Sequence, residues 1–218
     1  MTWFANYIFA EPKPSVISEF CNIPEVSNGL YIVDDLNDFQ WPDSSVCHGL
    51  PPGGFLISRE ICNLEAHAAG WYNDKAISWN VFIGPENIKV IEPSVIISTE
   101  LDESELAHLK EALPPIEFLR FLKSINLNTG SVVGFYYCAT WGGDIEEEFA
   151  WIFDEEDRIY RFRDEGTVFE FREDGSRKTI TGMVLSLFLN HLGLELSNGY
   201  FALCTRGFNW GRYKIKCN

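Results

Sequence analysis

The stretch Phe135-Tyr-Tyr-Cys-Ala-Thr-Trp-Gly-Gly-Asp-Ile-Glu-Glu-Glu-Phe-Ala-Trp-Ile-Phe153 holds two runs of aromatic and aliphatic residues separated by a Gly-Gly break. Aromatic residues are enriched in strands, and apolar residues at every second position indicate a strand with a buried face. In the first run Val133, Phe135, Tyr137 and Ala139 share one face, and in the second run Phe149, Trp151 and Phe153 do so. With Gly142-Gly143 between them, the two runs predict an antiparallel hairpin.

The residues that follow the hairpin extend the same pattern. Ile159–Arg163 and Thr167–Arg172 are two further strand candidates, and the acidic segments 154–157 and 164–166 are typical turn sequences between them. We therefore predict a four-stranded antiparallel β-meander over residues 131–172. Side chains alternate along Thr167–Arg172, which is typical of a sheet with one covered face.

Two helical regions are expected beside the meander. Asp102 and Glu105 form a helix-start signal, and Pro114-Pro115 separates a first helix from a second one. Together these helices cover about residues 103–125. Residues 181–192 include an almost wholly apolar run and predict a buried helix. The fold class is therefore α+β.

The N-terminal half is expected to be rich in strands. The candidates with apolar, β-forming composition are Trp3–Ala10, Gly29–Val33, Phe55–Ile61, Ala76–Ile83, Ile88–Ile91 and Val95–Ser98. Pro12 and Pro14 are expected to end the first of these strands. We interpret residues 1–218 as a single α+β domain, with a possible subdivision near residue 99 where the pattern changes from strands to helices.

The chain is strongly acidic, with 32 Asp and Glu residues against 17 Lys and Arg residues and a net charge of −15. Such a surface repels nucleic acid and anionic lipid and favours a basic protein partner. Arg206, Arg212, Lys214 and Lys216 follow Glu195 without an acidic residue, and we expect this basic tail to fold back onto the acidic body.

Localisation is predicted from the N-terminus and the cysteines. The first ten residues lack the basic start of a secretory signal, and no apolar run is long enough to span a bilayer. We therefore expect a cytoplasmic protein without membrane contact. Its six cysteines include no C-x-x-C pair, and cytoplasmic thiols stay reduced, so no disulfide framework is expected.

The best candidate for a functional site is the acidic end of the hairpin. From Trp141 to Asp157 the sequence contains eight acidic residues and no basic one. We predict a partner-binding surface, made of Trp141, Asp144, Glu146, Glu147 and Glu148. Alternation along a strand would place Glu146 and Glu148 on one face and Glu147 on the other. The simplest alternative is a solvated hairpin end without a partner.

Catalytic alternatives have weaker support. Two carboxylates about 7 Å apart on one strand face could form an acid/base pair or bind a hard metal ion. Asp144 and Glu146–Glu148 could thus serve a divalent-metal-dependent hydrolase or transferase. No nucleophile elbow, phosphate-binding loop or zinc-protease motif is present. His48, His67, His108 and His191 lack a catalytic context, so we expect no catalytic residues, metal or cofactor.

The segment from about Ile116 to Phe153 resembles bacterial toxin-immunity-type proteins, which neutralise toxins delivered between competing cells. The resemblance is carried by Leu113-Pro-Pro, Phe118-Leu-Arg-Phe-Leu122, Tyr136-Tyr137, Trp141-Gly-Gly-Asp144 and Glu148-Phe-Ala-Trp151, about a fifth of the chain. It implies a non-enzymatic, cytosolic, acidic inhibitor of a basic toxin such as a nuclease. A further alternative is a self-associating assembly subunit that does not use the acidic segment.

Overall fold

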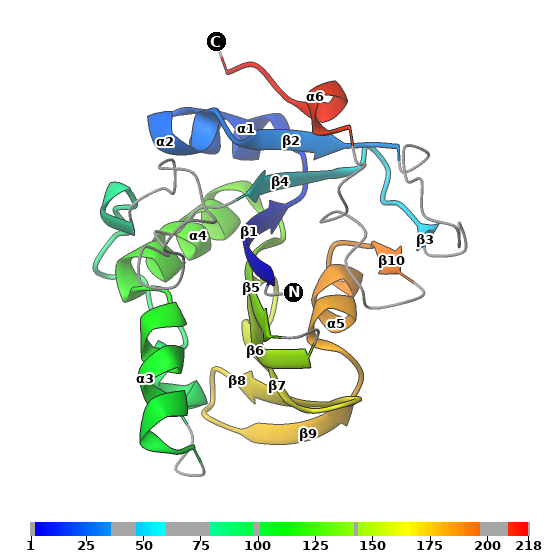
Figure 1. Ribbon diagram of the computed structural model, residues 1–218. Coiled ribbons are helices and arrows are strands. Elements are labelled where there is room, and N and C mark those ends of the chain that lie inside the picture. The colour runs from blue at the N-terminus through cyan, green and yellow to red at the C-terminus, as the bar shows by residue number, and fades with distance from the viewer. Residues whose placement is uncertain are drawn as a thin grey trace.

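An eight-stranded antiparallel sheet forms the centre of the computed structural model (Figure 1). The structure describes residues 3–35, 47–59, 79–97, 101–141, 144–196 and 209–217. The strand order is β2-β4-β1-β5-β6-β7-β8-β9, and all of the neighbouring pairs are antiparallel. Together with the helices on both sides of the sheet, this arrangement confirms the predicted α+β fold class.

The C-terminal half of the sheet is the predicted meander with one strand added. Its strands are β5 (Val133–Trp141), β6 (Asp144–Phe153), β7 (Arg158–Asp164), β8 (Thr167–Arg172) and β9 (Arg177–Thr181). The four predicted strands are therefore confirmed. The sequence pattern missed β9 because this edge strand is mostly exposed and lacks an apolar alternation.

Three strands from the N-terminal half complete the same sheet. They are β1 (Trp3–Ala10), β2 (Leu30–Val33) and β4 (Phe55–Arg59). Strand β1 lies between β4 and β5, so strands from both sides of residue 99 belong to one sheet. These three elements agree with the predicted strands, although the predicted end of the last one, beyond Arg59, lies outside the described residues.

Helices cover both faces of the sheet, in two separate hydrophobic cores. Helix α4 (Ile116–Thr129) packs against Phe135 and Phe149 on one face. Helix α5 (Val184–Asn190) packs against Tyr136 and Ile152 on the other face. Along β8, Val168 is buried in the core on the α5 side and Phe171 in the core on the α4 side, so the expectation of a single covered face is wrong. The predicted break at Pro114-Pro115 is confirmed, since it separates α4 from α3 (Glu103–Ala112).

Gly134 lets helix α5 approach the sheet closely. A Cβ atom at this position of β5 would collide with the ring of Phe188 and would lie 2.7 Å from the carbonyl oxygen of Trp151. Phe188 is fully buried in the core beneath α5. The missing side chain of Gly134 therefore provides the space that the Phe188 ring occupies.

Several predictions for the N-terminal half are wrong. Residues 79–81 and 93–96 form 3₁₀ helices, η1 (Trp79–Val81) and η2 (Pro93–Ile96), and residues 88–91 are not a strand. The apolar residues of η1 pack against α4, because the ring centroids of Trp79 and Phe118 lie 4.7 Å apart. Residues 76–78 and 98 lie outside the described part.

Short elements that the sequence pattern did not predict complete the chain. They are α1 (Pro14–Cys21), α2 (Pro24–Ser27), β3 (Cys47–Gly49), β10 (Glu195–Leu196) and α6 (Trp210–Tyr213). Strands β3 and β10 pair as a separate two-stranded sheet. Pro14 occupies the first turn of α1, where a missing N–H costs nothing, so it begins a helix instead of only ending β1. Among the described residues, no helix combines the length and apolar character that a membrane crossing requires.

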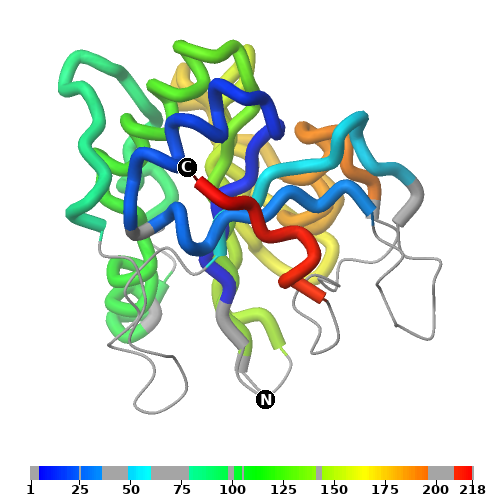
Figure 2. Tube along the Cα trace, turned by 90° about the horizontal axis from the view of Figure 1, so that it is seen from above, coloured from blue at the N-terminus to red at the C-terminus, as the bar shows by residue number. Residues whose placement is uncertain are grey.

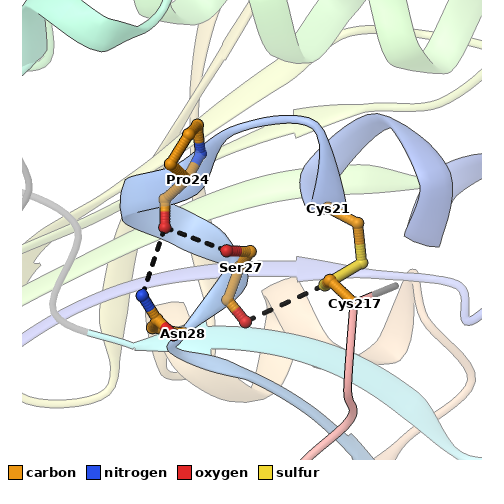
Figure 3. The surroundings of a disulfide bond; sticks show 5 residues. All are labelled: Cys21, Pro24, Ser27, Asn28 and Cys217. Carbon is orange, nitrogen blue, oxygen red and sulfur yellow. Dashed lines mark hydrogen bonds between the residues drawn. A yellow bond between two sulfur atoms is a disulfide. The ribbon is translucent and has the colours of Figure 1, made fainter.

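The basic C-terminal segment folds back over the outer edge of the sheet, as predicted (Figure 2). Arg212 Nη2 lies 3.0 Å from Asp35 Oδ2, and Lys214 forms a β-bridge with Tyr31 of β2. A disulfide joins Cys217 to Cys21 at the end of α1, with the two Cα atoms 5.2 Å apart (Figure 3). The expectation that the cysteines are all reduced is therefore wrong for this pair. Cys138 is buried and does not belong to a disulfide with any other described cysteine.

Candidate functional site

The predicted acidic surface lies where β5 and β6 meet at the hairpin end. The backbones of Trp141 and Asp144 pair across the two strands, and the side chains of Asp144 and Glu146 are exposed. The side chain of Trp141 and the residues Gly142-Gly143 lie outside the described part of the chain. Asp144 and Glu146 therefore present carboxylates to solvent at the tip of a hairpin whose base is anchored in both hydrophobic cores.

A β-bulge next to the tip separates the three consecutive glutamates. Ala139 pairs with Glu147 and Thr140 pairs with Ile145, so Glu146 is the extra residue of β6. Such a bulge changes the alternation of side chains along the strand. Glu146 is exposed whereas Glu148 is buried, so these two residues do not form the predicted pair on one face.

Glu147 is part of an ion pair on the α4 side of the sheet. Its carboxylate accepts two hydrogen bonds from Arg161 of β7, at 3.1 and 3.3 Å. Arg161 is buried and also donates to the backbone carbonyl of Ile96 at 2.6 Å. Because a buried guanidinium needs compensating acceptors, Glu147 holds Arg161 and the η2 segment against the sheet. This structural role leaves Glu147 poorly placed to meet a partner.

Glu148 lies in the core on the α5 side and is only 2% exposed. The hydroxyl of Tyr136 donates to Glu148 Oε1 at 2.7 Å. Burial raises the pKa of Glu148 to about 7, although the hydrogen bonds from Tyr136 and from the backbone of Leu185, in the first turn of α5, oppose the shift. Burial also raises the pKa of Tyr136. Glu148 is therefore an internal residue and not part of the predicted contact surface.

The four carboxylates do not converge on a common point. Glu147 and Glu148 point to opposite faces of the sheet, and each has a partner in the protein. Within the described ranges, no group of three or more His, Cys, Asp or Glu side chains is arranged to hold a metal ion. What remains accessible is an acidic tip, formed by Asp144 and Glu146, that can accept hydrogen bonds and ion pairs from a basic surface.

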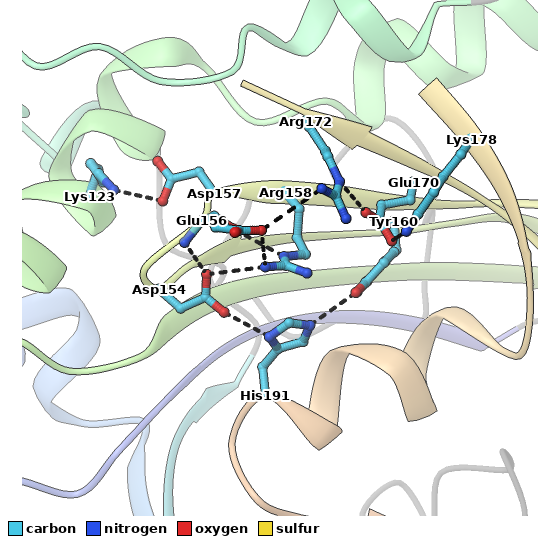
Figure 4. Close-up of polar contacts among 10 residues, drawn as sticks. All are labelled: Lys123, Asp154, Glu156, Asp157, Arg158, Tyr160, Glu170, Arg172, Lys178 and His191. Carbon is cyan, nitrogen blue, oxygen red and sulfur yellow. Dashed lines mark hydrogen bonds and ion pairs between the residues drawn. The ribbon is translucent and has the colours of Figure 1, made fainter. Parts of the chain in front are cut away.

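A second polar cluster, which the sequence did not predict, lies at the opposite end of the meander (Figure 4). Asp154 Oδ2 lies 2.7 Å from His191 Nδ1, and His191 Nε2 lies 3.0 Å from the Tyr160 hydroxyl. Burial would raise the pKa of Asp154, but hydrogen bonds from His191 and the Glu156 backbone outweigh it and lower that pKa. Burial raises the pKa of Tyr160.

This cluster connects α5 to the β6–β7 hairpin. His191 is the residue that caps the C-terminus of α5, while Asp154 and Tyr160 belong to the turn and to β7. The side chains of His191 and Asp154 are 18% and 16% exposed, so the contact is largely shielded from water. We assign an anchoring role to it. Little in the sequence indicates that His191 and Asp154 meet, because the two residues are 37 positions apart.

Comparisons with known proteins identify no relative, since no family model, no curated protein and no solved structure matches the chain.

Proposed function

We propose that this protein is an immunity-type inhibitor that binds a basic protein toxin and blocks it by steric and electrostatic occlusion. The exposed acidic tip, formed by Asp144 and Glu146, would meet Lys and Arg side chains of the toxin, and Trp141 would add an aromatic anchor beside it. The protein would act without a cofactor, in the cytoplasm of a bacterial cell that must survive the toxin.

The observation that carries this proposal is the exposure of two unneutralised carboxylates at the tip of a hairpin whose base is buried in both cores. Asp144 and Glu146 form no ion pair with any other described residue, whereas Glu147 is paired with Arg161. The tip therefore concentrates two of the uncompensated negative charges that give the chain its net charge of −15. Long-range attraction of this kind accelerates association with a cationic partner and is weakened by salt.

The test is binding to the small basic C-terminal module of a large protein encoded next to this gene. We expect tight binding at low salt, an association rate that falls steeply as ionic strength rises, and growth of cells that co-express both proteins. The double variant Asp144→Asn/Glu146→Gln should lower the association rate by about tenfold, the range in which electrostatic steering acts.

A matched control separates the tip from the overall charge. The double variant Glu86→Gln/Glu155→Gln also removes two exposed carboxylates, but at sites away from the hairpin tip. It should bind like the parent protein. An association rate that ignores ionic strength, or an equal loss in both double variants, would contradict a role for the acidic tip.

A further inference from the structure

The C-terminal strap, residues 209–217, runs over the edge of the central sheet (Figure 2). Its side chains contact first one hydrophobic core and then the other. Tyr213 is buried in the core on the α5 side, and Trp210 packs against the same core. Ile215 and Cys217 pack instead against the core on the α1 and α4 side. Since β2 is the outermost strand of the sheet, the strap covers its free edge.

The first part of the strap is held by several noncovalent contacts. The Tyr213 hydroxyl donates to the Asp35 carbonyl at 2.6 Å, and Arg212 pairs with the Asp35 carboxylate. The centroid of the Trp210 ring lies 5.0 Å from that of the Tyr31 ring. The guanidinium carbon of Arg59 lies 4.2 Å from the centroid of the same Trp210 ring. A buried tyrosine with a satisfied hydroxyl is a strong anchor, so residues 210–213 are fixed without the disulfide.

The last part of the strap depends much more on the covalent bond. Ile215 N–H donates to the Leu30 carbonyl at 3.2 Å, and Lys214 bridges to Tyr31. Lys214 and Lys216 are exposed, and Ile215 and Cys217 are half-buried. One β-bridge and one backbone hydrogen bond hold this short segment only weakly, because water competes for the same groups and the net contribution of each hydrogen bond is small. The Cys21–Cys217 bond ties this segment down.

We propose that the Cys21–Cys217 disulfide is a reducible latch that holds residues 214–217 over the edge of β2. Both cysteines are partly accessible, and accessible disulfides are the ones that exchange readily with thiols. Two molecules of a low-molecular-weight thiol of the glutathione class would break the S–S bond through a mixed disulfide. The products are the Cys21 and Cys217 thiols and one oxidised thiol dimer.

Release would remain local because the anchor at Tyr213 lies before the released residues. After reduction, residues 214–217 would leave the edge while residues 210–213 stay in place, and Tyr213 would mark the hinge. The backbone of Leu30–Val33 would then lose its cover on the outer side, and unpaired edge groups are templates for strand addition. The redox state of the surroundings would thus decide whether this edge is closed.

Hydrogen exchange of the full-length protein, read by mass spectrometry before and after treatment with reduced glutathione, tests the latch. Complete reduction is verified by alkylation of Cys21 and Cys217. We expect exchange of the Ile215 amide and of the Leu30–Val33 segment to accelerate at least tenfold through local release, while β5 and β6 still exchange much more slowly than this edge.

The variant Cys21→Ser/Cys217→Ser serves as the matched comparison. Without any added thiol, the variant should already show the fast exchange at Ile215 and Leu30–Val33. Glutathione should not accelerate this exchange further, which would show that the other cysteines do not cause the effect. Retained protection of Ile215 after complete reduction would overturn the latch. Exchange in β5 and β6 that becomes as fast as exchange of the Leu30–Val33 edge would also overturn it, because the strap would then be released only by unfolding of the whole domain.

Discussion

Glu148 occupies a position in which a neutral carboxylic acid is more stable than a carboxylate. The side chain is 2% exposed and lies in an apolar core between β6 and α5. Tyr136 donates to Oε1 and the Leu185 backbone contributes a further contact, but Oε2 is buried and accepts no hydrogen bond of ordinary geometry from the described residues. Removal of a charge from water without full compensation is costly, so folding favours the protonated form.

The first prediction is a loss of stability with rising pH that depends on Glu148. The pKa of Glu148 is about 7 in the folded protein, whereas the ordinary pKa of a glutamate, which applies to the unfolded chain, is 4.5. The folded state therefore binds this proton more tightly, and the free energy of unfolding falls as pH rises through that window. We expect Glu148→Gln to be more stable than the parent above the folded pKa, by on the order of 3 kcal/mol.

Urea unfolding at about pH 5 and about pH 8 measures this effect, since the two values lie near the ends of the window. Glu146→Gln is the matched control, because Glu146 belongs to the same strand but is exposed, and it should change stability little at either pH. A difference between Glu148→Gln and the parent that does not grow with pH would contradict the buried-acid interpretation.

The candidate site was only partly predictable at the scale of residues. A run of carboxylates next to Gly142-Gly143 indicates a hairpin end, and the exposure of Asp144 and Glu146 agrees with it. The burial of Glu148 depends on the bulge at Glu146 and on the position of α5. Both are tertiary features, and a strand pattern of period two does not reveal them.

The docking of helix α5 depends on a single residue of the sheet, Gly134. Its buried side chains include Leu185, Phe188 and Leu189, and Phe188 rests in the space left by Gly134 of β5. At its C-terminal end, His191 connects α5 to Asp154 and Tyr160. The helix is thus located by one apolar contact in its middle and one polar contact at its end.

The second prediction concerns this contact. Gly134→Ala would place a methyl group against the Phe188 ring and the Trp151 carbonyl, so Phe188 or the strand must shift. Overpacking of this kind lowers the free energy of unfolding by about 2 kcal/mol. Gly211→Ala is the control, because a Cβ there lies at an ordinary 3.5 Å from Asn209 Oδ1. Urea unfolding compares the two, and equal stability would show that α5 does not pack on Gly134.

Elements with a strong local signal were predictable, and those defined by distant contacts were not. The pattern Leu113-Pro-Pro followed by a stripe of apolar residues defines α4, and alternation defines the meander. Trp79–Val81 has strand-like composition, but its packing against Phe118 selects a 3₁₀ turn. In α1, Pro14 is compatible with both a strand end and a helix start, so the sequence alone does not decide between them.

At the scale of the whole molecule, the Cys21–Cys217 bond connects residues 196 positions apart and so encloses most of the chain. Cysteine spacing does not reveal such a pairing, because six cysteines permit many combinations. Closing so long a loop reduces the conformational entropy of the unfolded chain more than closing a short one. The effect on stability is therefore separate from the local effect on the strap.

The third prediction follows from this loop. Cys21→Ser/Cys217→Ser should lower the free energy of unfolding by about 4 to 5 kcal/mol relative to the oxidised parent, through the greater entropy of the unfolded state. Guanidinium unfolding of both proteins without reductant gives the difference. The reduced parent should match the double variant. If the oxidised parent also matches it, the bond contributes nothing to the equilibrium and the loop argument fails.

The position of β1 in the middle of the sheet has a consequence for synthesis on the ribosome. Strand β1 pairs with β4 on one side, but its other neighbour, β5, ends only at Trp141. While residues beyond β4 are being translated, the nascent chain carries the unsatisfied flank of β1. Such a flank is prone to aggregate, so this interval is when chaperones would be needed most.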